Sequence, residues 1–363
     1  MSKRITVHNK KAQPIYDIVI EKSFDLLCDE LKKLGIEKKR LCIVTESKVG
    51  PLYAEEIAAL LQNQAKEVHI FEFPYGESNK TLNTVQNLYE FLILHKFDRK
   101  DMLLALGGGV VGDLTGFTAA TYLRGIDFVQ IPTSLLAQVD SSIGGKTGVD
   151  FSAYKNMVGA FHQPKLVYMN LSVLNTLSDA EYLSGFGEII KHGCIKDADY
   201  FHTLQAQLPQ VLARDLDVLE EIIATSCHIK RRVVENDAKE HGERALLNFG
   251  HTLGHAIEKL MNFELLHGEC VAIGAVAAAH LAMKKNLLTT EEAGKIEAVF
   301  AGYQLPTKVP AKLSASDIVT ATLNDKKMDA GVIQFILLDG IGNGVISRAV
   351  TQEDMLDAIE ACR

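Results

Sequence analysis

The sequence lacks any uninterrupted apolar run long enough to cross a membrane, which takes roughly 18 residues. The longest apolar stretch, CVAIGAVAAAHLAM, extends only from Cys270 to Met283 and contains a histidine, so it predicts a buried helix. The opening stretch, MSKRITVHNK, contains no apolar segment of the kind found in secretory signal sequences. We therefore expect no membrane association and a cytoplasmic location.

An excess of positive charge is also missing. The chain of 363 residues has a formal net charge of -8 at pH 7, whereas proteins that bind nucleic acids usually present a net basic face. We therefore expect no nucleic-acid partner. The cysteines, which show no CxxC spacing, are Cys28, Cys42, Cys194, Cys227, Cys270 and Cys362. Scattered cysteines in a chain of this size indicate free thiols in a reducing compartment.

Short β-rich segments alternate with helical patterns in the first half of the chain. They cover residues 16–20, 41–45, 67–71, 102–106, 127–131 and 165–169. Near-continuous apolar strands that alternate with helices predict a parallel sheet covered by helices. After about Thr176 the strand signals fade, and apolar residues spaced by three and four predict a mainly helical second half. We expect a Rossmann-like α/β domain over residues 1–175 and a mainly α-helical domain over residues 176–363.

A glycine-rich turn follows the segment 102–106. Gly107, Gly109 and Gly112 lie in LLALGGGVVGD, which Asp113 ends, and the next residues suit a helix. Glycines at such a turn let the backbone approach a pyrophosphate, and free N–H groups at the helix start attract an anion. The alternative is that the turn only packs tightly. A second polar, glycine-rich stretch, PTSLLAQVDSSIGGKTG, follows the next strand, and two such loops form the crevice where open α/β sheets bind ligands. A dinucleotide is therefore the expected ligand.

Histidine and glutamate residues in the second half form a candidate metal site. His251 and His255 in NFGHTLGHAIE are four residues apart, so they share one face of a predicted helix, and His267 follows in LLHGE. Glu188, in an earlier helical segment, could add a carboxylate oxygen. Two imidazoles and one carboxylate leave coordination positions open to substrate, as a catalytic Zn2+ requires. Spacing does not select which two histidines bind, and a single histidine in a helix is more often an ordinary core or surface residue.

Several basic residues of this acidic chain lie in glycine- or histidine-rich contexts, which indicates a phosphate or carboxylate ligand. They are Arg124, Lys146, Lys155, Lys191, Lys230, Arg244, Lys326 and Lys327. Lys191 follows Glu188 by three residues, so a helix places it beside the candidate metal ligand. Arg231 and Arg232 are expected to be solvated surface residues.

The sequence resembles the 3-dehydroquinate synthase family over nearly its whole length. The matching motifs are GGGVVGDLTGFTAATYLRG, IPTSLLAQVDSSIGGKTGVD, KNMVGAFHQP, GFGEIIKHG, ERALLNFGHTLGHAIE and HGECVAIG, in the order typical of that family. The resemblance implies an NAD-binding N-terminal domain, a helical domain that binds metal and substrate, and a homodimer. It also implies a step of the shikimate pathway: conversion of the sugar phosphate 3-deoxy-D-arabino-heptulosonate 7-phosphate to 3-dehydroquinate and phosphate, with NAD and Zn2+ or Co2+.

The resemblance further implies roles for individual residues. The implied metal ligands are Glu188, His251 and His267, which leaves His255 at the active-site wall near the leaving phosphate. The implied substrate contacts are Lys146, Lys155, Asn156, Lys191, Lys230, Arg244 and Asn248, together with Arg124 across a dimer interface and Asp140 near the cofactor. The residues implied for NAD are Glu46, Glu77, Lys80, Gly108, Gly109, Asp113, Thr133, Ser134, Lys146, Lys155 and Thr176. Two of these depart from the usual pattern: Ser134, where threonine is common, and Glu46, where Asp or Asn is usual.

In the implied mechanism, the substrate alcohol passes a hydride to NAD+, phosphate is eliminated, the hydride returns, and an intramolecular aldol reaction closes the carbocycle. The nearest alternatives are other NAD- and metal-dependent sugar-phosphate cyclases, which accept glucose 6-phosphate or a heptulose phosphate without the carboxylate. A polyol dehydrogenase would instead accumulate NADH. A binding or scaffolding protein would require the metal and lysine positions to be degraded, and they are intact.

Overall fold

The computed structural model describes residues 3–152, 154–237, 242–262, 264–324, 328–329 and 332–363. The chain divides into two compact units, Met1–Leu177 and Ser178–Arg363. Each unit is described by itself. Lys326 and Lys327, which the sequence analysis proposes as anion-binding residues, lie outside the described residues.

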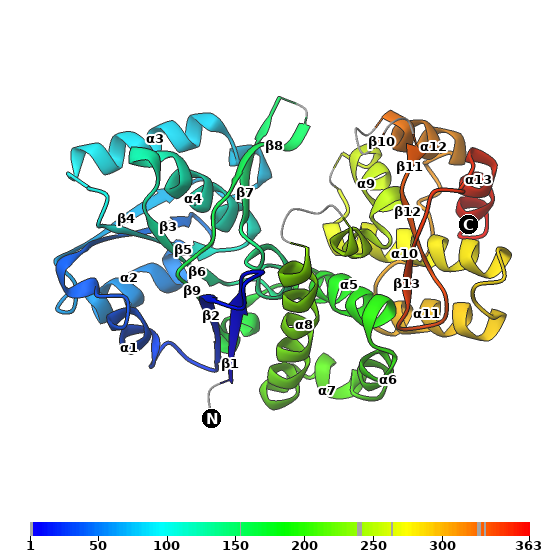
Figure 1. The fold of residues 1–363 in the computed structure, drawn as a ribbon, viewed down its shortest axis with the longest axis horizontal. Helices are drawn as coiled ribbons and strands as arrows, with labels where there is room; N and C mark the ends of the chain where they lie inside the picture. The colour runs from blue at the N-terminus through cyan, green and yellow to red at the C-terminus, as the bar shows by residue number, and fades with distance from the viewer. Residues whose placement is uncertain (1–2, 153, 238–241, 263, 325–327, 330–331) are drawn as a thin grey trace. The chain divides into compact units, whose positions relative to one another are not determined.

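The first unit is built on a seven-stranded sheet (Figure 1). Its strands are β1 (Lys3–His8), β2 (Pro14–Glu21), β3 (Arg40–Glu46), β4 (Glu67–Phe73), β5 (Met102–Gly107), β6 (Asp127–Pro132) and β9 (Leu166–Asn170). They lie in the order β1-β2-β9-β6-β5-β3-β4, and β1 with β2 is the antiparallel pair in an otherwise parallel sheet. The six segments expected as strands are confirmed. Strand β1 is not among the segments predicted from the sequence, because only Ile5 and Val7 give this strand an apolar face.

Helices cover both faces of this sheet. They are α1 (Leu27–Lys32), α2 (Gly50–Leu61), α3 (Leu82–Leu94) and α4 (Gly109–Thr121), with short turns η1 (Ile36–Lys38), η2 (Glu77–Asn79), η3 (Tyr122–Arg124), η4 (Ala137–Ser141) and η5 (Leu171–Thr176). Because side chains of a strand alternate between faces, Leu104 of β5 packs with Ile57 of α2, whereas Leu103 packs with Leu88 of α3. An antiparallel hairpin, β7 (Lys146–Phe151) and β8 (Tyr154–Phe161), packs against α4.

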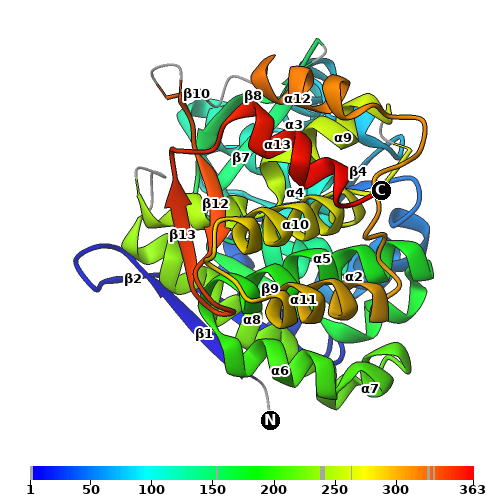
Figure 2. The ribbon, with the colours of Figure 1, turned by 90° about the vertical axis from the view of Figure 1, so that its right-hand side faces the viewer.

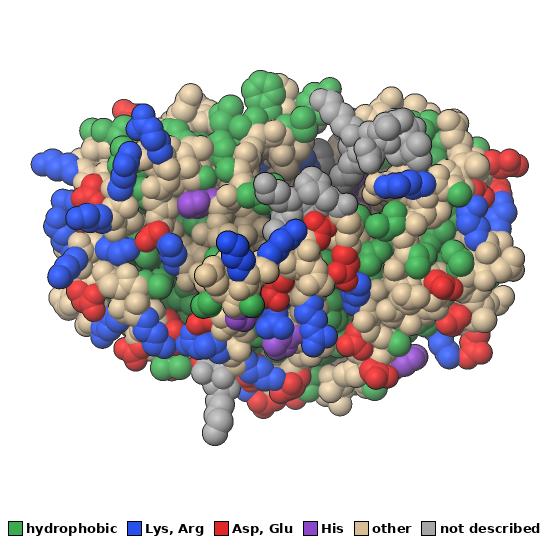
Figure 3. Space-filling model, in the orientation of Figure 1, with side chains coloured by type: hydrophobic (Ala, Val, Ile, Leu, Met, Phe, Trp, Pro, Cys, Tyr) green, Lys and Arg blue, Asp and Glu red, His purple; other side chains and the backbone are tan. Residues whose placement is uncertain are grey.

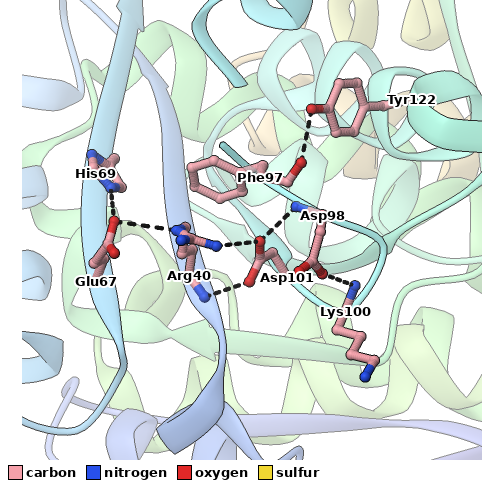
Figure 4. Close-up of polar contacts among 8 residues, drawn as sticks. All are labelled: Arg40, Glu67, His69, Phe97, Asp98, Lys100, Asp101 and Tyr122. Carbon is pink, nitrogen blue, oxygen red and sulfur yellow. Dashed lines mark hydrogen bonds and ion pairs between the residues drawn. The ribbon is translucent and has the colours of Figure 1, made fainter. Parts of the chain in front are cut away.

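A polar network closes the edge of the sheet where β3, β4 and β5 begin (Figure 4). Asp101 is 2% exposed; its Oδ1 accepts a hydrogen bond from the backbone N–H of Arg40 (2.7 Å), and its Oδ2 accepts one from Asp98 (2.7 Å). The Arg40 guanidinium donates to Glu67 at 3.3 Å, and Glu67 also contacts His69. The Asp101 carboxylate therefore joins the start of β3 to the turn before β5, at the edge opposite the glycine-rich turn.

The second unit is mainly helical, as the sequence predicts. Its helices are α5 (Asp179–Lys196), α6 (Ala198–Ala206), α7 (Leu208–Leu212), α8 (Leu216–Asn236), α9 (His251–Leu260), α10 (His267–Lys284), α11 (Thr290–Gly302), α12 (Ala315–Asn324) and α13 (Gln352–Glu360), with the turn η6 (Glu243–Asn248). Its short strands are β10 (Met328–Asp329), β11 (Val332–Ile333), β12 (Phe335–Leu338) and β13 (Gly344–Ser347).

Helix α10 forms the centre of this unit and contacts α5, α9, α11, α13 and β12 (Figure 2). Nearly all apolar residues of α10 are buried, so the stretch Cys270 to Met283 is the buried helix that the sequence predicts. Among the residues described, no helix combines the length and apolar character needed to span a membrane. On the molecular face drawn in Figure 3, Lys and Arg side chains are interspersed with Asp and Glu.

Replacing Asp101 by alanine should loosen the edge of the first unit. The N–H groups of Arg40 and Asp98, which form part-buried hydrogen bonds, would lose their acceptors, at a cost of about 1–3 kcal/mol. Hydrogen exchange of the β3 and β5 amides, followed by mass spectrometry, should accelerate accordingly. The matched control is Asp98→Asn, which removes an exposed charge of the same turn but keeps the side-chain oxygen that accepts the Lys100 N–H, so it should change exchange little. Equal exchange rates in the two variants would contradict the role assigned to Asp101.

Candidate active site

The carboxyl edge of the sheet gathers the residues implied for a dinucleotide. Glu46 ends β3, Gly107 ends β5, and Thr133 follows β6. Strand β4, which follows β3 in the sequence, lies on one side of β3, and the next strand, β5, lies on its other side. The strand order therefore reverses between β3 and β5. Ligands of open α/β sheets bind outside the strand ends at such a switch point. Glu46 and the glycine-rich turn therefore flank the crevice that this topology predicts.

The glycine-rich turn leaves the start of α4 open to an anion. Gly108 is the residue before the helix, and within the described part of the chain no side chain caps the first helical N–H groups. A methyl group on Gly109 would lie 3.2 Å from the Ser141 hydroxyl, and one on Gly112 would lie 2.7 Å from the Gln130 amide oxygen. Tight packing thus accounts for Gly112, whereas the uncapped N–H groups beside Gly109 suit a pyrophosphate.

Lys80 connects several of the implied cofactor and substrate residues. Its ammonium group, on a side chain 5% exposed, donates to Asp113 Oδ2 (2.7 Å) and to Asn156 Oδ1 (2.6 Å). Lys155 lies 3.8 Å from Glu77 in the same cluster. Burial alone would lower the pKa of Lys80, but the charges of Asp113 and Glu77 outweigh it and raise that pKa. Lys80 therefore stays cationic and fastens the β7–β8 hairpin to the helix that follows the glycine turn.

The hydrogen bonds described for the remaining implied residues of the first unit join groups other than Lys80, although the charge of Asp140 acts on Asp113. The Glu46 carboxylate accepts hydrogen bonds from the N–H groups of Lys48 (2.6 Å) and Val49 (3.1 Å), so it stabilises its own turn before α2. Thr176 shares a hydrogen bond of 2.7 Å with the Tyr53 hydroxyl. The other implied residues are Thr133, a buried residue after β6; Ser134, whose hydroxyl accepts from Ala137 N–H; Asp140 in η4; Lys146, exposed at the start of β7; and Arg124, exposed in η3.

The four candidate metal ligands converge in the second unit. Glu188 comes from α5, His251 and His255 come from α9, and His267 begins α10. The Nε2 atoms of His251 and His267 lie 3.2 Å and 3.4 Å from the same oxygen, Glu188 Oε1. The three imidazoles offer nitrogen atoms that lie within 4.8 Å of one another. The structure therefore brings together all the candidates that residue spacing left open.

The two imidazoles nearest Glu188 are oriented by their other ring nitrogen. His251 Nδ1 lies 3.1 Å from the Phe249 carbonyl oxygen, and His267 Nδ1 lies 3.5 Å from Glu258 Oε2. An N–H at Nδ1 in both rings leaves Nε2 as the nitrogen that can bind a metal, which is the arrangement found around metal-bound histidines.

Glu188 provides the test of whether a cation fits this cluster. It is fully buried, and neither of its oxygens accepts a hydrogen bond of good geometry from any described residue, although Lys191 forms a short ion pair with Oε2. Buried polar atoms are normally hydrogen-bonded, so such an oxygen facing two imidazole nitrogens suits a divalent ion. Carboxylate and imidazole are also the ligand types that Zn2+ accepts.

The charges of this cluster shift the protonation of its members. Burial would raise the pKa of Glu188, but Lys191 and His251 hold that pKa well below the ordinary value, so the carboxylate is ionised. Burial and the Lys191 charge lower the pKa of His251. Burial would also lower the pKa of His267, but its contacts with Glu188 and Glu258 outweigh it and raise that pKa to about 9.

Glycines allow the three ligand-bearing helices to approach closely. A methyl group on Gly187 of α5 would lie 2.5 Å from the carbonyl oxygen of Gly268, and one on Gly268 would overlap the carbonyl oxygen of Ser184. Gly250, with φ of 80°, precedes α9, and a methyl group on it would lie 2.6 Å from the Val271 carbonyl oxygen. The backbones therefore touch directly beside the ligand residues.

Candidate anion-binding residues lie on α5, α8 and η6 of the same unit. Lys191 donates to the Leu247 carbonyl at 2.6 Å, which links α5 to η6. Lys230 of α8 and Arg244 of η6 are 5% and 3% exposed, so both are buried cations, and Asn248 ends η6 half-buried. Asp237 also fixes this turn, because its Oδ2 accepts a hydrogen bond from the Arg244 N–H (3.1 Å). This role of Asp237 is not predicted from the sequence. An aspartate after a helix gives no sequence signal for such a role.

Comparison with known proteins identifies the relatives of this chain. Residues 70–184 match the family model described as 3-dehydroquinate synthase N-terminal, and residues 185–328 match the one described as 3-dehydroquinate synthase C-terminal. The 3-dehydroquinate synthase of Desulforamulus reducens is 44% identical over 88% of this chain and 89% of its own length. That of Nitrosomonas europaea is 45% identical over 89% of this chain and 88% of its own length.

Solved structures show the same two-unit architecture. The 2-epi-5-epi-valiolone synthase of Streptomyces hygroscopicus subsp. jinggangensis, solved with NAD+ and Zn2+ bound, superposes with a TM-score of 0.88 at 30% identity, covering 96% of each chain. A 2-deoxy-scyllo-inosose synthase superposes with a TM-score of 0.86 at 24% identity over 100% of both chains, which shows the shared fold. The fold is thus that of the sugar-phosphate cyclases. Within this class, the chain belongs to the 3-dehydroquinate synthase family.

Replacing Gly268 by alanine should force α5 and α10 apart, because the added methyl group overlaps a backbone carbonyl that cannot move aside alone. Overpacking of this kind costs about 1–3 kcal/mol, so thermal unfolding followed by circular dichroism should begin at lower temperature. The matched control is Gly294→Ala in α11, where the methyl group meets no atom within 4 Å. That exposed helical site should gain about 0.5–1 kcal/mol from the substitution. A Gly268→Ala protein as stable as wild type would refute the close packing.

Proposed function

We propose that this chain catalyses the 3-dehydroquinate synthase reaction, as a carbon–oxygen lyase that converts 3-deoxy-D-arabino-heptulosonate 7-phosphate to 3-dehydroquinate and phosphate. The observation that supports this most directly is the 42–45% identity to several curated relatives of that name over most of the chain. The reaction belongs to the shikimate pathway, which leads to chorismate and the aromatic amino acids.

For the metal, we propose Glu188, His251 and His267 as the ligands, with Zn2+ or Co2+ as the ion. The convergence of both Nε2 atoms on one buried Glu188 oxygen favours this set. His255 then contributes to the wall of the site beside its neighbour on α9. When bound, the metal would supply polarisation of the substrate hydroxyl, and NAD would supply a reversible hydride acceptor.

In the helical unit, the proposed substrate contacts are buried cations and polar groups held before substrate arrives. The Lys191 ammonium, fixed by Glu188 and the Leu247 carbonyl, presents positive charge beside the metal ligands. Lys230 and Arg244 supply two more buried cations, and Asn248 adds an amide. Preorganised positive charge stabilises a departing phosphate better than mobile surface lysines do, because little reorganisation accompanies the reaction.

In the α/β unit, we propose an NAD site along the carboxyl edge of the sheet. Gly108 and Gly109 would receive the pyrophosphate at the uncapped start of α4. The other proposed contacts, which line this edge or the Lys80 cluster, are Glu46, Glu77, Lys80, Asp113, Thr133, Ser134, Lys146, Lys155 and Thr176, with Asn156 and Asp140 beside them. Because Lys80 ties Asp113 to the β7–β8 hairpin, it positions the lysines of that hairpin as well.

We further propose a cytoplasmic homodimer in which Arg124 reaches the partner's site. The exposed Leu123 and Arg124 occupy consecutive left-handed backbone positions, with φ of 50° and 68°. Non-glycine residues adopt such conformations at a cost, and strain of this kind is typical of functional positions. Contact with a partner subunit would explain why this turn holds an arginine outward.

The activity itself predicts a specific pattern in a phosphate-release assay. Phosphate and dehydroquinate should appear together from the heptulosonate phosphate, only with NAD+ and a divalent metal, and without lasting NADH absorbance at 340 nm, because the hydride returns to the product. Removal of metal by a chelator should abolish turnover, and Zn2+ or Co2+ should restore it. Turnover of glucose 6-phosphate in place of the heptulosonate would assign a sister cyclase activity, and accumulation of NADH would assign a dehydrogenase.

Histidine variants separate ligands from wall residues in the same assay. His251→Ala should lose bound metal and turnover together, whereas His255→Ala should keep its metal and lose turnover. His280→Ala is the control, because His280 pairs with Glu297 away from the cluster. Full metal occupancy in His251→Ala would remove His251 from the ligand set.

Metal binding should release protons at pH 7. With its pKa raised to about 9, His267 is protonated in the metal-free protein at that pH, and it must become neutral at Nε2 to bind a metal. His251, whose pKa is lowered, is already neutral and contributes little. Calorimetric titrations in two buffers of different ionisation enthalpy should therefore report close to one proton released, and metal affinity should rise with pH up to about 9. A binding enthalpy independent of the buffer would show that His267 is neutral before metal arrives.

A further inference from the structure

A second glutamate lies within the ligand cluster and has no role in the implied reaction. Glu258 is on α9, seven residues after His251 and three after His255, so all three share the face of this helix that packs on α10. Glu258 is 6% exposed, and its neighbours Ala256 and Ile257 are buried apolar residues. A carboxylate at such a position is costly to bury unless it interacts with a cationic or N–H group.

The interaction of Glu258 is with His267. Its Oε2 lies 3.5 Å from Nδ1 of the imidazole, while Nε2 of the same ring lies 3.4 Å from Glu188 Oε1. The two carboxylates therefore bracket one ring from opposite sides. Glu258 also has interactions elsewhere in the structure, so its position does not depend on His267 alone.

A neutral imidazole carries one N–H and one lone pair, and the partner of one nitrogen decides which nitrogen holds the proton. A carboxylate at Nδ1 favours the N–H there and leaves the lone pair on Nε2. His251 reaches the same state through the backbone, since its Nδ1 faces the Phe249 carbonyl. For His267, the orienting partner is a side chain.

We propose that Glu258 is a positioning residue for the metal site: through Nδ1 it fixes the orientation and tautomer of His267, so that Nε2 is presented to the divalent ion. This inference rests on the metal site of the proposed function. It adds a residue outside the ligand set whose loss weakens the site while every ligand remains.

The test compares Glu258→Ala and Glu258→Gln with wild type by metal affinity, measured by competition of Zn2+ with a chromophoric chelator. Losing such a partner typically costs about 10- to 100-fold in affinity, so we expect that loss for Glu258→Ala. Glutamine can still accept a hydrogen bond from Nδ1–H, so Glu258→Gln should recover most of the affinity. The visible absorption bands of bound Co2+ should shift in Glu258→Ala and resemble wild type in Glu258→Gln, a change that a general loss of packing does not produce.

The matched control is Glu297→Gln, which changes the carboxylate of a glutamate–histidine pair outside the candidate metal cluster, 3.6 Å from His280, and should leave affinity and spectrum unchanged. Circular dichroism of the metal-free proteins checks that each variant is folded. If Glu258→Ala does not fold, Glu258→Gln and Glu258→Leu are compared instead. Wild-type affinity and spectrum in Glu258→Gln, together with a loss in Glu258→Leu, would then support the inference. Wild-type affinity and spectrum in Glu258→Ala, or an equal loss in Glu297→Gln, would overturn the inference alone. Failure of the wild-type protein to bind Zn2+ or Co2+ would instead overturn the metal site of the proposed function, and this inference with it.

Discussion

The helical unit depends on how the charge of one buried carboxylate is compensated. Glu188 is completely buried, and an isolated ionised carboxylate in such a place would be severely destabilising. Lys191 supplies a positive charge from the next turn of the same helix, and the imidazoles of His251 and His267 approach from two other helices. Nitrogen atoms surround the Glu188 carboxylate but do not hydrogen-bond it well, so this carboxylate is suited to a divalent cation. The arrangement that compensates the buried charge of Glu188 is therefore also the one that the proposed metal site requires.

The backbone packing explains why these side chains meet. Each proposed ligand is next to a glycine in the sequence: Gly187 precedes Glu188, Gly250 precedes His251, and Gly268 follows His267. At all three glycines a neighbouring backbone lies too close for a methyl group. The helices therefore touch where the ligands begin, and their side chains need to reach only a short distance. In this unit the glycines determine the site geometry as much as the ligands do.

The sequence predicts those parts of the structure that repeat a local pattern. Buried strands such as β5 appear as apolar runs, and the resemblance to a family supplies candidate ligands that spacing alone leaves ambiguous. The β7–β8 hairpin is not predicted, because its exposed residues, Phe151 and Tyr154 among them, give it no clear apolar face. Contacts between distant residues, such as Lys80 with Asp113, leave no local pattern at all. Glu258 is a related case, since a glutamate in a helix usually indicates a solvated surface.

His251 and His267, the two histidines that face Glu188, differ in the group that orients each imidazole ring. The Phe249 carbonyl that orients His251 belongs to the backbone before α9, so any side chain at that position supplies it. The partner of His267 is a carboxylate, which adds charge as well as direction. A negative group behind an imidazole makes its far nitrogen a stronger electron donor toward a cation. In the proposed metal site, His267 is therefore the ligand through which the chain can adjust metal affinity without altering coordination, whereas His251 is fixed by the fold.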